Sequence, residues 1–298
     1  MLLTMVFWGV SFVASKLVLS QIQPLTYMGV RFLIASVLLA VVMALRGRPA
    51  FSRKTHLLIA LTALAEPVAY FLFESYGIRL ITATTASLII ATIPLAVTIL
   101  ASLFLGEPAR PGGLVAVGVS IAGIALLVVG GDPAGESARN QVVGILLVAG
   151  AVLSAAFYIT LARDLTQKVD PVHLTVIQTW WGAAVFGLLW GMQSPSGRSL
   201  AGLSAWGWIA LAFLAVGATV GAFLLYNWAL RYERAATAAL YINAIPVITA
   251  LTGWVALGER LTPLQLAGGA LVLVSVRIAT RAAPEPVAET VHNLPPEA

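Results

Sequence analysis

Apolar stretches of roughly 20 residues recur along the chain, separated by short polar or Gly/Pro-containing segments. At 1.5 Å per residue, a helix needs about 20 residues to cross the roughly 30 Å of hydrocarbon in a bilayer. The pattern predicts an all-α integral membrane protein with ten transmembrane helices, at residues 2–20, 25–45, 57–78, 83–105, 112–130, 141–162, 171–192, 204–229, 235–257 and 263–281. The remainder, residues 282–298, is rich in Pro, Glu and Ala and predicts a disordered tail.

An internal repeat relates the two halves of the chain. After a shift of 152 residues, residues 74–107 align without gaps on residues 226–259, and eleven of 34 positions are identical. These include an Arg, a Thr, a Pro and a final Leu-Gly-Glu, which apolar composition alone rarely produces. Each half holds five helices. Because five is an odd number, the second half enters the membrane from the opposite face, and its orientation is inverted. We expect inverted repeats at residues 1–137 and 138–281, a recurrent construction of secondary transporters.

Basic residues are divided unevenly between the two ends of the predicted helices. Eleven Lys and Arg lie on the side of the termini, four lie on the other side, and Lys16 and Arg31 lie inside helices. Cytoplasmic loops carry an excess of Lys and Arg, so we expect both termini, and the tail with them, to be cytoplasmic. The net charge of +5 then reflects topology, and no nucleic-acid partner is expected.

Composition excludes several other classes of protein. Only 10% of the residues are charged, against about 25% in soluble domains, which indicates a membrane protein. The apolar stretches run from the first residues to Arg281 and leave no room for a soluble domain. Cysteine is absent and the three histidines lack metal-ligand spacing, so neither a metal nor another cofactor is expected. The segment GGDPAGES (residues 130–137) lacks the Gly-Lys-Ser/Thr ending of a phosphate-binding loop, which argues against ATP-driven transport.

Two prolines lie at equivalent positions of the repeat, in the middle of predicted helices. Pro94 and Pro246 each remove one helical hydrogen bond and push against the carbonyl group four residues back, at Ile90 and Ile242. One interpretation is a static kink, because proline is tolerated in spanning helices. The other is a pair of hinges about which the half-helices bend during transport, and the symmetry of the repeat favours it.

Four charged residues lie inside predicted helices. At 1.5 Å per residue, Glu74, Lys16 and Arg31 lie roughly 6, 6 and 9 Å below the outer boundary, and Glu66 lies roughly 18 Å deep. The three shallow residues can reach water or form ion pairs. Glu74 can pair with Arg31 or Lys16, and such a pair can be structural or part of a substrate site. An ionised carboxylate at the depth of Glu66 is costly. Three interpretations of Glu66 stay open: a group that takes up protons or binds a substrate amine, a buried structural hydrogen bond, or a misplaced helix boundary.

Further polar and aromatic residues are candidates for a central cavity. Tyr70 lies one turn from both acids and shares one side of the third helix with them. In the second half, the polar groups nearest the middle of the helices are Tyr158, Gln178, Tyr241 and Asn243. Trp8, Phe12, Trp180 and Trp181 are candidate wall residues, although aromatic residues in spanning helices more often pack or anchor at the interface.

Four segments resemble the EamA-type members of the drug/metabolite transporter superfamily: FWGVSFVASK (7–16), QPLTYMGVRFLIA (23–35), IPLAVTILASLFLGEP (93–108) and IPVITALTGWVALGER (245–260). The resemblance covers about residues 3–280. It implies ten helices in two inverted halves, cytoplasmic termini, and export of small metabolites or amino acids across an inner membrane. It does not imply a substrate. One departure is that Pro108 and Ala109 separate Glu107 from Arg110, whereas Glu259 and Arg260 are adjacent.

Together these patterns favour a secondary active transporter of the inner (plasma) membrane. We expect an exporter of small metabolites or amino acids that works by alternating access, with protons as a candidate coupling ion. Its expected partners are a small-molecule substrate and the lipid bilayer, and the sequence does not indicate an oligomeric state. A polytopic membrane enzyme and a channel stay open as alternatives, although no acid–histidine cluster or Gly-x-Ser-x-Gly motif supports catalysis.

Overall fold

The described part of the protein is built from helices. The computed structural model describes residues 1–47, 51–105, 111–130, 136–232 and 241–282. The first half contains α1 (Leu2–Leu19), α2 (Pro24–Arg46), α3 (Arg53–Ala63), η1 (Leu64–Ala69), α4 (Tyr70–Leu80), α5 (Ala83–Ile90), α6 (Ile93–Leu105) and α7 (Pro111–Val129). The second half contains α8 (Glu136–Lys168), α9 (Pro171–Gly191), α10 (Ala205–Phe213), η2 (Leu214–Gly221), α11 (Ala222–Tyr232), η3 (Ile242–Ala244), α13 (Ile245–Leu257) and α14 (Pro263–Ala282). The predicted tail lies outside the described residues, except for its first residue, Ala282, where α14 ends.

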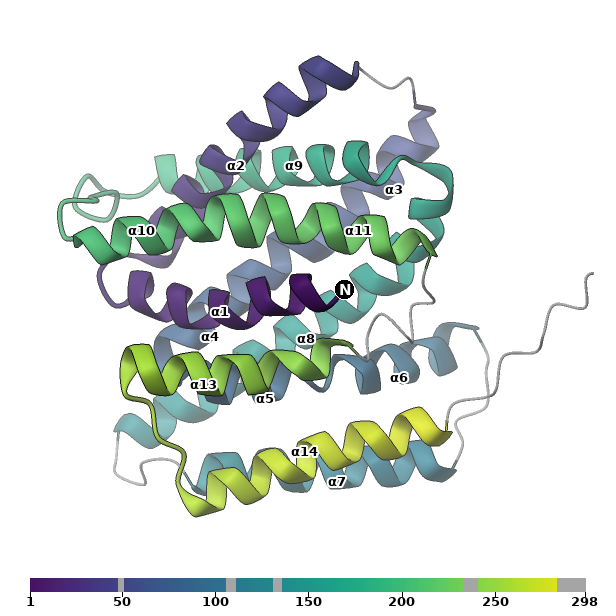
Figure 1. Cartoon of the computed structure of the whole chain (residues 1–298), viewed down its shortest axis with the longest axis vertical. Coiled ribbons are helices and arrows are strands. Elements are labelled where there is room, and N and C mark those ends of the chain that lie inside the picture. The colour runs from purple at the N-terminus through teal and green to yellow at the C-terminus, as the bar shows by residue number, and fades with distance from the viewer. Residues whose placement is uncertain (48–50, 106–110, 131–135, 233–240, 283–298) are drawn as a thin grey trace, which may run out of the picture.

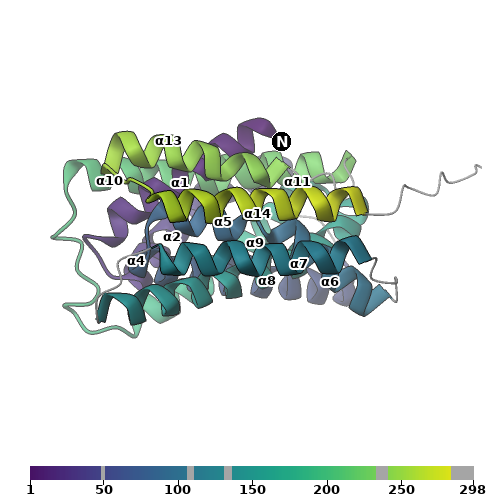
Figure 2. The same cartoon turned by 90° about the horizontal axis from the view of Figure 1, so that it is seen from below.

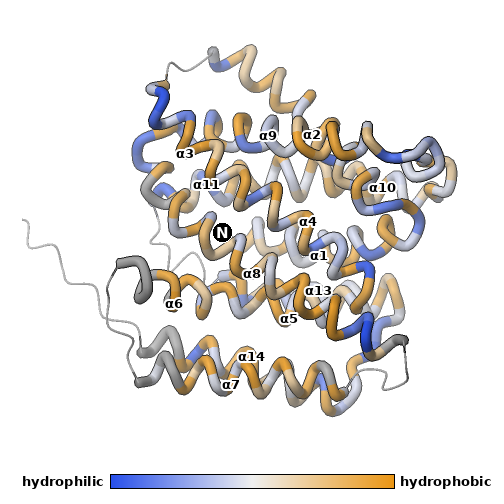
Figure 3. Tube along the Cα trace, turned by 180° about the vertical axis from the view of Figure 1, so that it is seen from behind, coloured by the Kyte–Doolittle hydropathy of each residue, from blue (hydrophilic) through white to orange (hydrophobic). Residues whose placement is uncertain are grey.

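Hydropathy and length mark most of these helices as membrane segments. Six described segments are long and apolar enough to cross a membrane: Leu2–Leu19, Pro24–Arg46, Arg53–Leu80, Ala138–Lys168, Pro171–Gly191 and Ala205–Tyr232. Four shorter apolar helices lie at Ala83–Val97, Val115–Leu127, Ile242–Leu257 and Pro263–Ile278. Hydrophobic residues cover the middle of the bundle, and most hydrophilic residues lie toward the helix ends (Figure 3). An all-helical protein with several candidate spans is therefore confirmed.

The helices run back and forth between two faces of the molecule (Figures 1 and 2). The terminal face is the side of the molecule at which α2 and α11 end and α9 begins. The distal face is the opposite side, at which α1 ends and α5 begins. The α7 and α14 helices pack side by side along one edge of the bundle, and α1 lies near its middle (Figure 1).

Two pairs of helices recur in the two halves at a spacing of 152 residues. The bounds of α4 and α11 differ by 152 residues at both ends, and so do those of α6 and α13. The π-helical stretches η1 and η2 also fall at matching places, just before α4 and α11. The spacing found in the sequence therefore reappears in the secondary structure.

Two of the segments predicted as single helices are interrupted next to a proline. The segment predicted as one helix over residues 83–105 is two helices, because α5 ends at Ile90 and α6 begins at Ile93. Pro94 is the second residue of α6, where a missing backbone N–H costs no helical hydrogen bond. Pro246 is likewise the second residue of α13, after the short 3₁₀ turn η3. The prediction of prolines inside continuous helices is corrected: the break comes before each proline. Residues 235–240 of the other predicted helix lie outside the described residues.

Another interruption occurs in η1, midway along the Arg53–Leu80 segment. Glu66 has an extended backbone (φ −145°, ψ 119°) inside the π-helical stretch, and the peptide bond to Pro67 is cis. Pro67 cannot donate to the helix, so the ladder of backbone hydrogen bonds is broken at this point.

Candidate functional site

A cavity lies where the interrupted segments meet. Its walls come from α1, α2, η1, α4, α5, α6, α8, α11, η3 and α13. The cavity brings together six of the residues expected from the sequence: Trp8, Phe12, Arg31, Glu66, Tyr70 and Glu74. Its volume of about 30 Å³ holds water but not a metabolite. In this conformation the centre of the molecule is therefore nearly closed.

Glu66 is a buried carboxylate with 7% of its surface exposed. Among the described residues, no hydrogen bond to its carboxylate is found, whereas Glu74 in the same cavity has one. Buried polar groups are nearly always hydrogen-bonded, and a buried carboxylate usually has a cation or several donors. The structure thus gives no donor for a structural hydrogen bond at Glu66, and it places the carboxylate at the cavity wall.

Glu74 differs from Glu66 because it has a fixed partner. The Tyr70 hydroxyl donates a hydrogen bond to Glu74 Oε1 at 2.9 Å, within one turn of α4. Glu74 is 5% exposed and lines the same cavity as Arg31. No ion pair within 4.0 Å joins the two side chains in the described part of the chain. Glu74 and Arg31, which were expected to pair, therefore line the same cavity without forming a direct ion pair.

The Arg31 guanidinium is held in one orientation. Its Nε donates to Thr219 Oγ1 at 2.8 Å, and its Nη1 donates to the Tyr27 hydroxyl. Its central carbon lies 4.3 Å from the centre of the Phe71 ring, a cation–π distance. Arginine has five N–H donors in a planar fork, so a guanidinium fixed in this way can still bind a carboxylate with its remaining donors.

Lys16 lies away from the cavity, at the distal face. Its ammonium donates to the carbonyl oxygens of Ile78 and Ile81 at 2.8 Å and of Arg79 at 3.3 Å, where α4 ends. A cation at a helix C-terminus is favourable because the last carbonyl groups lack helical partners. Lys16 was expected to pair with Glu74 or to contact substrate, but the structure assigns it to the end of α4.

Glu259 also lies at the distal face, where it binds the start of α5. Its Oε1 accepts from the backbone N–H of Ala83 at 2.8 Å, and its Oε2 accepts from the N–H and the hydroxyl of Thr84. The Leu-Gly-Glu motif of the second half thereby caps α5 of the first half. We name this corner, formed by Lys16, Glu259 and the α4–α5 turn, the distal latch. Glu107, the repeat equivalent of Glu259, lies outside the described residues.

The residues expected from the second half are dispersed. Tyr158 and Gln178 are buried, and the Tyr158 hydroxyl donates to Asn227 Oδ1 at 2.7 Å. Tyr241 lines a surface pocket near Met1 and not the central cavity. Asn243 precedes α13, and its buried Oδ1 has no partner among the described residues.

Trp180 and Trp181 do not line the cavity wall. Their side chains are 38% and 42% exposed. The Trp180 indole N–H donates at 3.2 Å to the carbonyl oxygen of Ser36 on α2. Both residues therefore fit the packing and anchoring interpretation of aromatic residues in spanning helices.

Several cavity residues were not identified from the sequence, although the repeat carried the signal. Phe71 and Phe223 both line the cavity and are equivalent under the 152-residue shift. The same holds for the pairs Ile90/Ile242, Ile93/Ile245 and Glu74/Tyr226. The Tyr226 hydroxyl is buried without a described partner. Equivalent positions of the two halves thus line the same cavity. The repeat could have identified them, because one residue of each pair points to the other.

Comparison with known proteins decides the family. The model of the EamA-like transporter family matches residues 1–129 and again residues 142–281. The chain belongs to the EamA-like transporter family. The resemblance read from the sequence motifs is confirmed, and the protein is a transporter.

Individual relatives agree with this EamA-like assignment. An uncharacterized transporter of Archaeoglobus fulgidus is 31% identical over 94% of this chain and 96% of its own length. The probable terminal-alkyne amino-acid exporter of Streptantibioticus cattleyicolor is 27% identical over 94% of this chain and 92% of its own length. One crystal structure of a protein covers 94% of this EamA-like transporter with a TM-score of 0.66, and at 19% identity it supports the fold alone.

Proposed function

We propose that this EamA-like transporter is a secondary active exporter of small metabolites or amino acids, coupled to protons, that works by alternating access. The observation that carries the proposal is the position of Glu66. It lies midway along a spanning segment, where the helix is broken, beside a cavity that also holds Glu74 and Arg31. In secondary transporters, substrate and coupling-ion sites lie near the midplane between discontinuous helices.

The proposed topology is ten spans in two inverted repeats, residues 1–137 and 138–281, followed by a cytoplasmic tail. The equal spacing of α4/α11 and α6/α13 supports a duplication, and so do the two separate family matches. The excess of Lys and Arg on the side of the termini supports cytoplasmic termini, and the bacterial transporter relatives support a plasma membrane. The terminal face is then cytoplasmic and the distal face external.

The proposed substrate is a small zwitterion with an apolar part. Arg31 supplies a cation for a carboxylate, Glu74 supplies an anion for an amine, and Phe71, Phe223 and Trp8 supply apolar walls. The amino-acid exporter among the relatives supports this class of substrate. Because the cavity of about 30 Å³ is too small for an amino acid, the helices must separate to admit one. The interruptions before Pro94 and Pro246 are the proposed hinges.

Uptake into proteoliposomes tests this function. A panel of aliphatic and aromatic amino acids is offered to vesicles with and without a pH gradient. We expect at least one of them to move faster than in protein-free vesicles, and faster with the gradient than without it. Transport of no panel member would reject the substrate class, and a flux that ignores the gradient would reject proton coupling.

The distal latch supplies a prediction about alternating access. The chain has no cysteine, so Ser11→Cys puts a single thiol at the cavity wall. Glu259→Gln weakens the cap on α5, and we expect an impermeant thiol reagent on the distal side to label the introduced thiol about fivefold faster, as expected for the loss of about 1 kcal/mol of capping. Ser204→Ala, which removes the N-cap of α10 at the same face, is the control and should leave the labelling rate unchanged. Equal rates with and without Glu259→Gln would contradict the latch.

A further inference from the structure

The α9 helix carries a buried polar face that the transport site does not use. Thr175, Gln178 and Thr179 are 1%, 4% and 4% exposed and lie on one side of a 21-residue apolar helix. Polar side chains inside a spanning segment are costly, and they are typical of substrate, ion or proton pathways. Of these three residues, none lines the central cavity.

A second, smaller cavity lies between this polar face and Glu66. Glu66, Thr175, Gln178, Thr179 and Thr219 contribute the polar part of its walls. Its volume of about 10 Å³ is close to the space needed by one water molecule, which would find several polar partners there. Glu66 also lines the central cavity, so it contributes to the walls of both cavities.

Hydrogen bonds continue the polar face toward the terminal face. Asn227 Nδ2 donates to Thr175 Oγ1 at 2.9 Å, and the Thr175 hydroxyl donates to the Pro171 carbonyl oxygen at 2.8 Å. Gln178 Nε2 donates to Thr62 Oγ1 at 2.9 Å. The contacts from the second cavity through Thr175 to Pro171 form a buried polar line to the first residue of α9, and the bonds to Asn227 and Thr62 join this line to α11 and α3.

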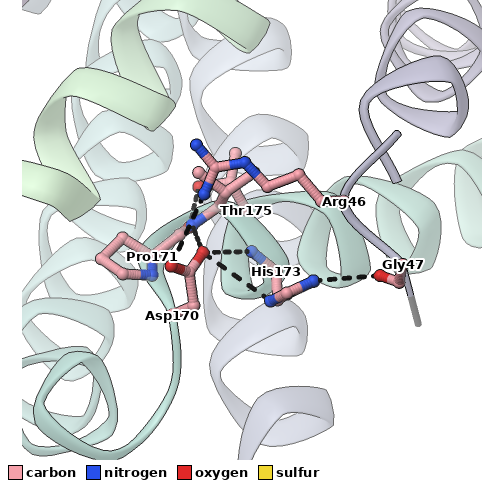
Figure 4. A network of polar contacts seen from close by, with 7 residues as sticks. Arg46, Gly47, Asp170, Pro171, His173 and Thr175 are labelled. Atoms are coloured by element: carbon pink, nitrogen blue, oxygen red, sulfur yellow. Dashed lines mark hydrogen bonds and ion pairs between the residues drawn. The ribbon is translucent and has the colours of Figure 1, made fainter. Parts of the chain in front are cut away.

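The line ends at a charged cluster in contact with water. The side chain of Asp170 is 39% exposed and caps α9 by accepting from the N–H of Val172 and of His173. Arg46 lies 3.8 Å from Asp170, and His173 Nε2 lies 3.2 Å from the Gly47 carbonyl oxygen (Figure 4). The cluster joins the end of α2 to the start of α9, and it lies where the polar line reaches the surface.

The other ionisable groups around Glu66 lie on different helices. Glu74 and Tyr70 on α4, and Arg31 on α2, line the central cavity with it. Tyr226 on α11 also lines that cavity, and Tyr158 on α8 is buried and donates to Asn227 Oδ1. On α9, the residues that line the second cavity are Thr175, Gln178 and Thr179, and none of them ionises. The α9 side of Glu66 is therefore polar but uncharged.

We propose that the polar face of α9 and the second cavity form the route by which protons pass between Glu66 and the aqueous phase at the terminal face. The inference rests on the proposed proton coupling and adds the path to it. Water enters the line beside Asp170 and reaches Glu66. There the carboxylic acid gives its proton to water, forming a carboxylate and a hydronium ion, and the reverse step restores the acid. Substrate uses the central cavity, on the other side of the same carboxylate.

The test follows the protonation of Glu66 directly, without a substrate. Infrared difference spectra of the reconstituted full chain are recorded after a pH jump on the terminal side. The carboxylic-acid band that Glu66→Gln removes is assigned to Glu66. We expect Thr175→Val, which keeps the shape of the side chain and removes its hydroxyl, to slow the appearance of this band several-fold. Thr175→Ser, which restores the hydroxyl, should restore the rate. Thr249→Val removes a buried hydroxyl that donates to Gly9 and should leave the rate unchanged.

The outcomes distinguish failure of the route from failure of the proton coupling. A Glu66 band that forms equally fast in Thr175→Val and in the wild type would overturn the route and leave proton coupling intact. Equal slowing by Thr175→Val and Thr249→Val would also overturn the route, because the effect would not depend on α9. If Glu66→Gln removes no band at any pH, Glu66 does not take up protons, and both the coupling and the route are wrong.

Discussion

Glu66→Gln is expected to abolish flux driven by a pH gradient while leaving solute exchange measurable. Glutamine keeps the size of the side chain but cannot bind and release a proton. Removing a group that transfers protons typically lowers a rate by about 100-fold or more, and we expect an effect of that order on gradient-driven uptake. Exchange of labelled for unlabelled amino acid needs no net proton movement, so it should persist. Both rates are measured in the same proteoliposomes.

Glu74→Gln is the matched control for this prediction. It removes a buried carboxylate from the same cavity, only eight residues away, but one whose Oε1 is already bonded to Tyr70. We expect this variant to keep its response to the pH gradient and to change the concentration of amino acid needed for half-maximal uptake. If the two variants lose gradient-driven flux equally, the specific role of Glu66 is wrong.

Arg31→Met is expected to abolish both gradient-driven flux and exchange. Arg31 is 1% exposed and is the cation of a cavity that holds two carboxyl groups. Methionine fills similar space but leaves Glu66 and Glu74 without a counter-charge and Thr219 without its partner. Removing one member of a buried charged group typically costs about 3–5 kcal/mol, so we also expect a lower midpoint of thermal unfolding in detergent.

Arg31→Lys separates binding from folding. Lysine keeps the positive charge but loses the planar fork that Thr219, Tyr27 and Phe71 hold in place. We expect a nearly normal unfolding midpoint and an apparent affinity for the amino acid about tenfold weaker, as for the loss of about 1.4 kcal/mol. An unchanged affinity with full flux in Arg31→Lys would show that the guanidinium does not bind substrate.

Much of the fold was predictable because hydropathy and repetition act at the scale of whole helices. The predicted spans 2–20, 25–45 and 171–192 agree with α1, α2 and α9 to within a residue or two at each end. The break between α5 and α6 was not predicted, although Pro94 pointed to it. A proline in a sequence indicates that a helix is perturbed, but the packing of neighbouring helices decides whether the helix kinks or ends.

The site was predictable only where a residue type is costly in a membrane. Glu66, Glu74 and Arg31 stood out because charged side chains are rare in spanning segments, and the structure brings them to one cavity. Phe71 and Phe223 did not stand out, because aromatic residues are ordinary in such helices. Lys16 was misplaced because depth along a helix does not tell which side the residue faces. The direction of each helix face depends on contacts between helices far apart in the sequence.

Solute counterflow tests the central claim, alternating access through one central site, most directly. Proteoliposomes are loaded with an unlabelled amino acid that the uptake panel identifies, and the same labelled amino acid is added outside at trace concentration. A carrier exchanges the two through one site, so we predict that the label accumulates transiently above its external concentration and then declines. A label that only equilibrates would indicate a channel, and a label recovered in a chemically altered form would indicate an enzyme. Either result would contradict the account.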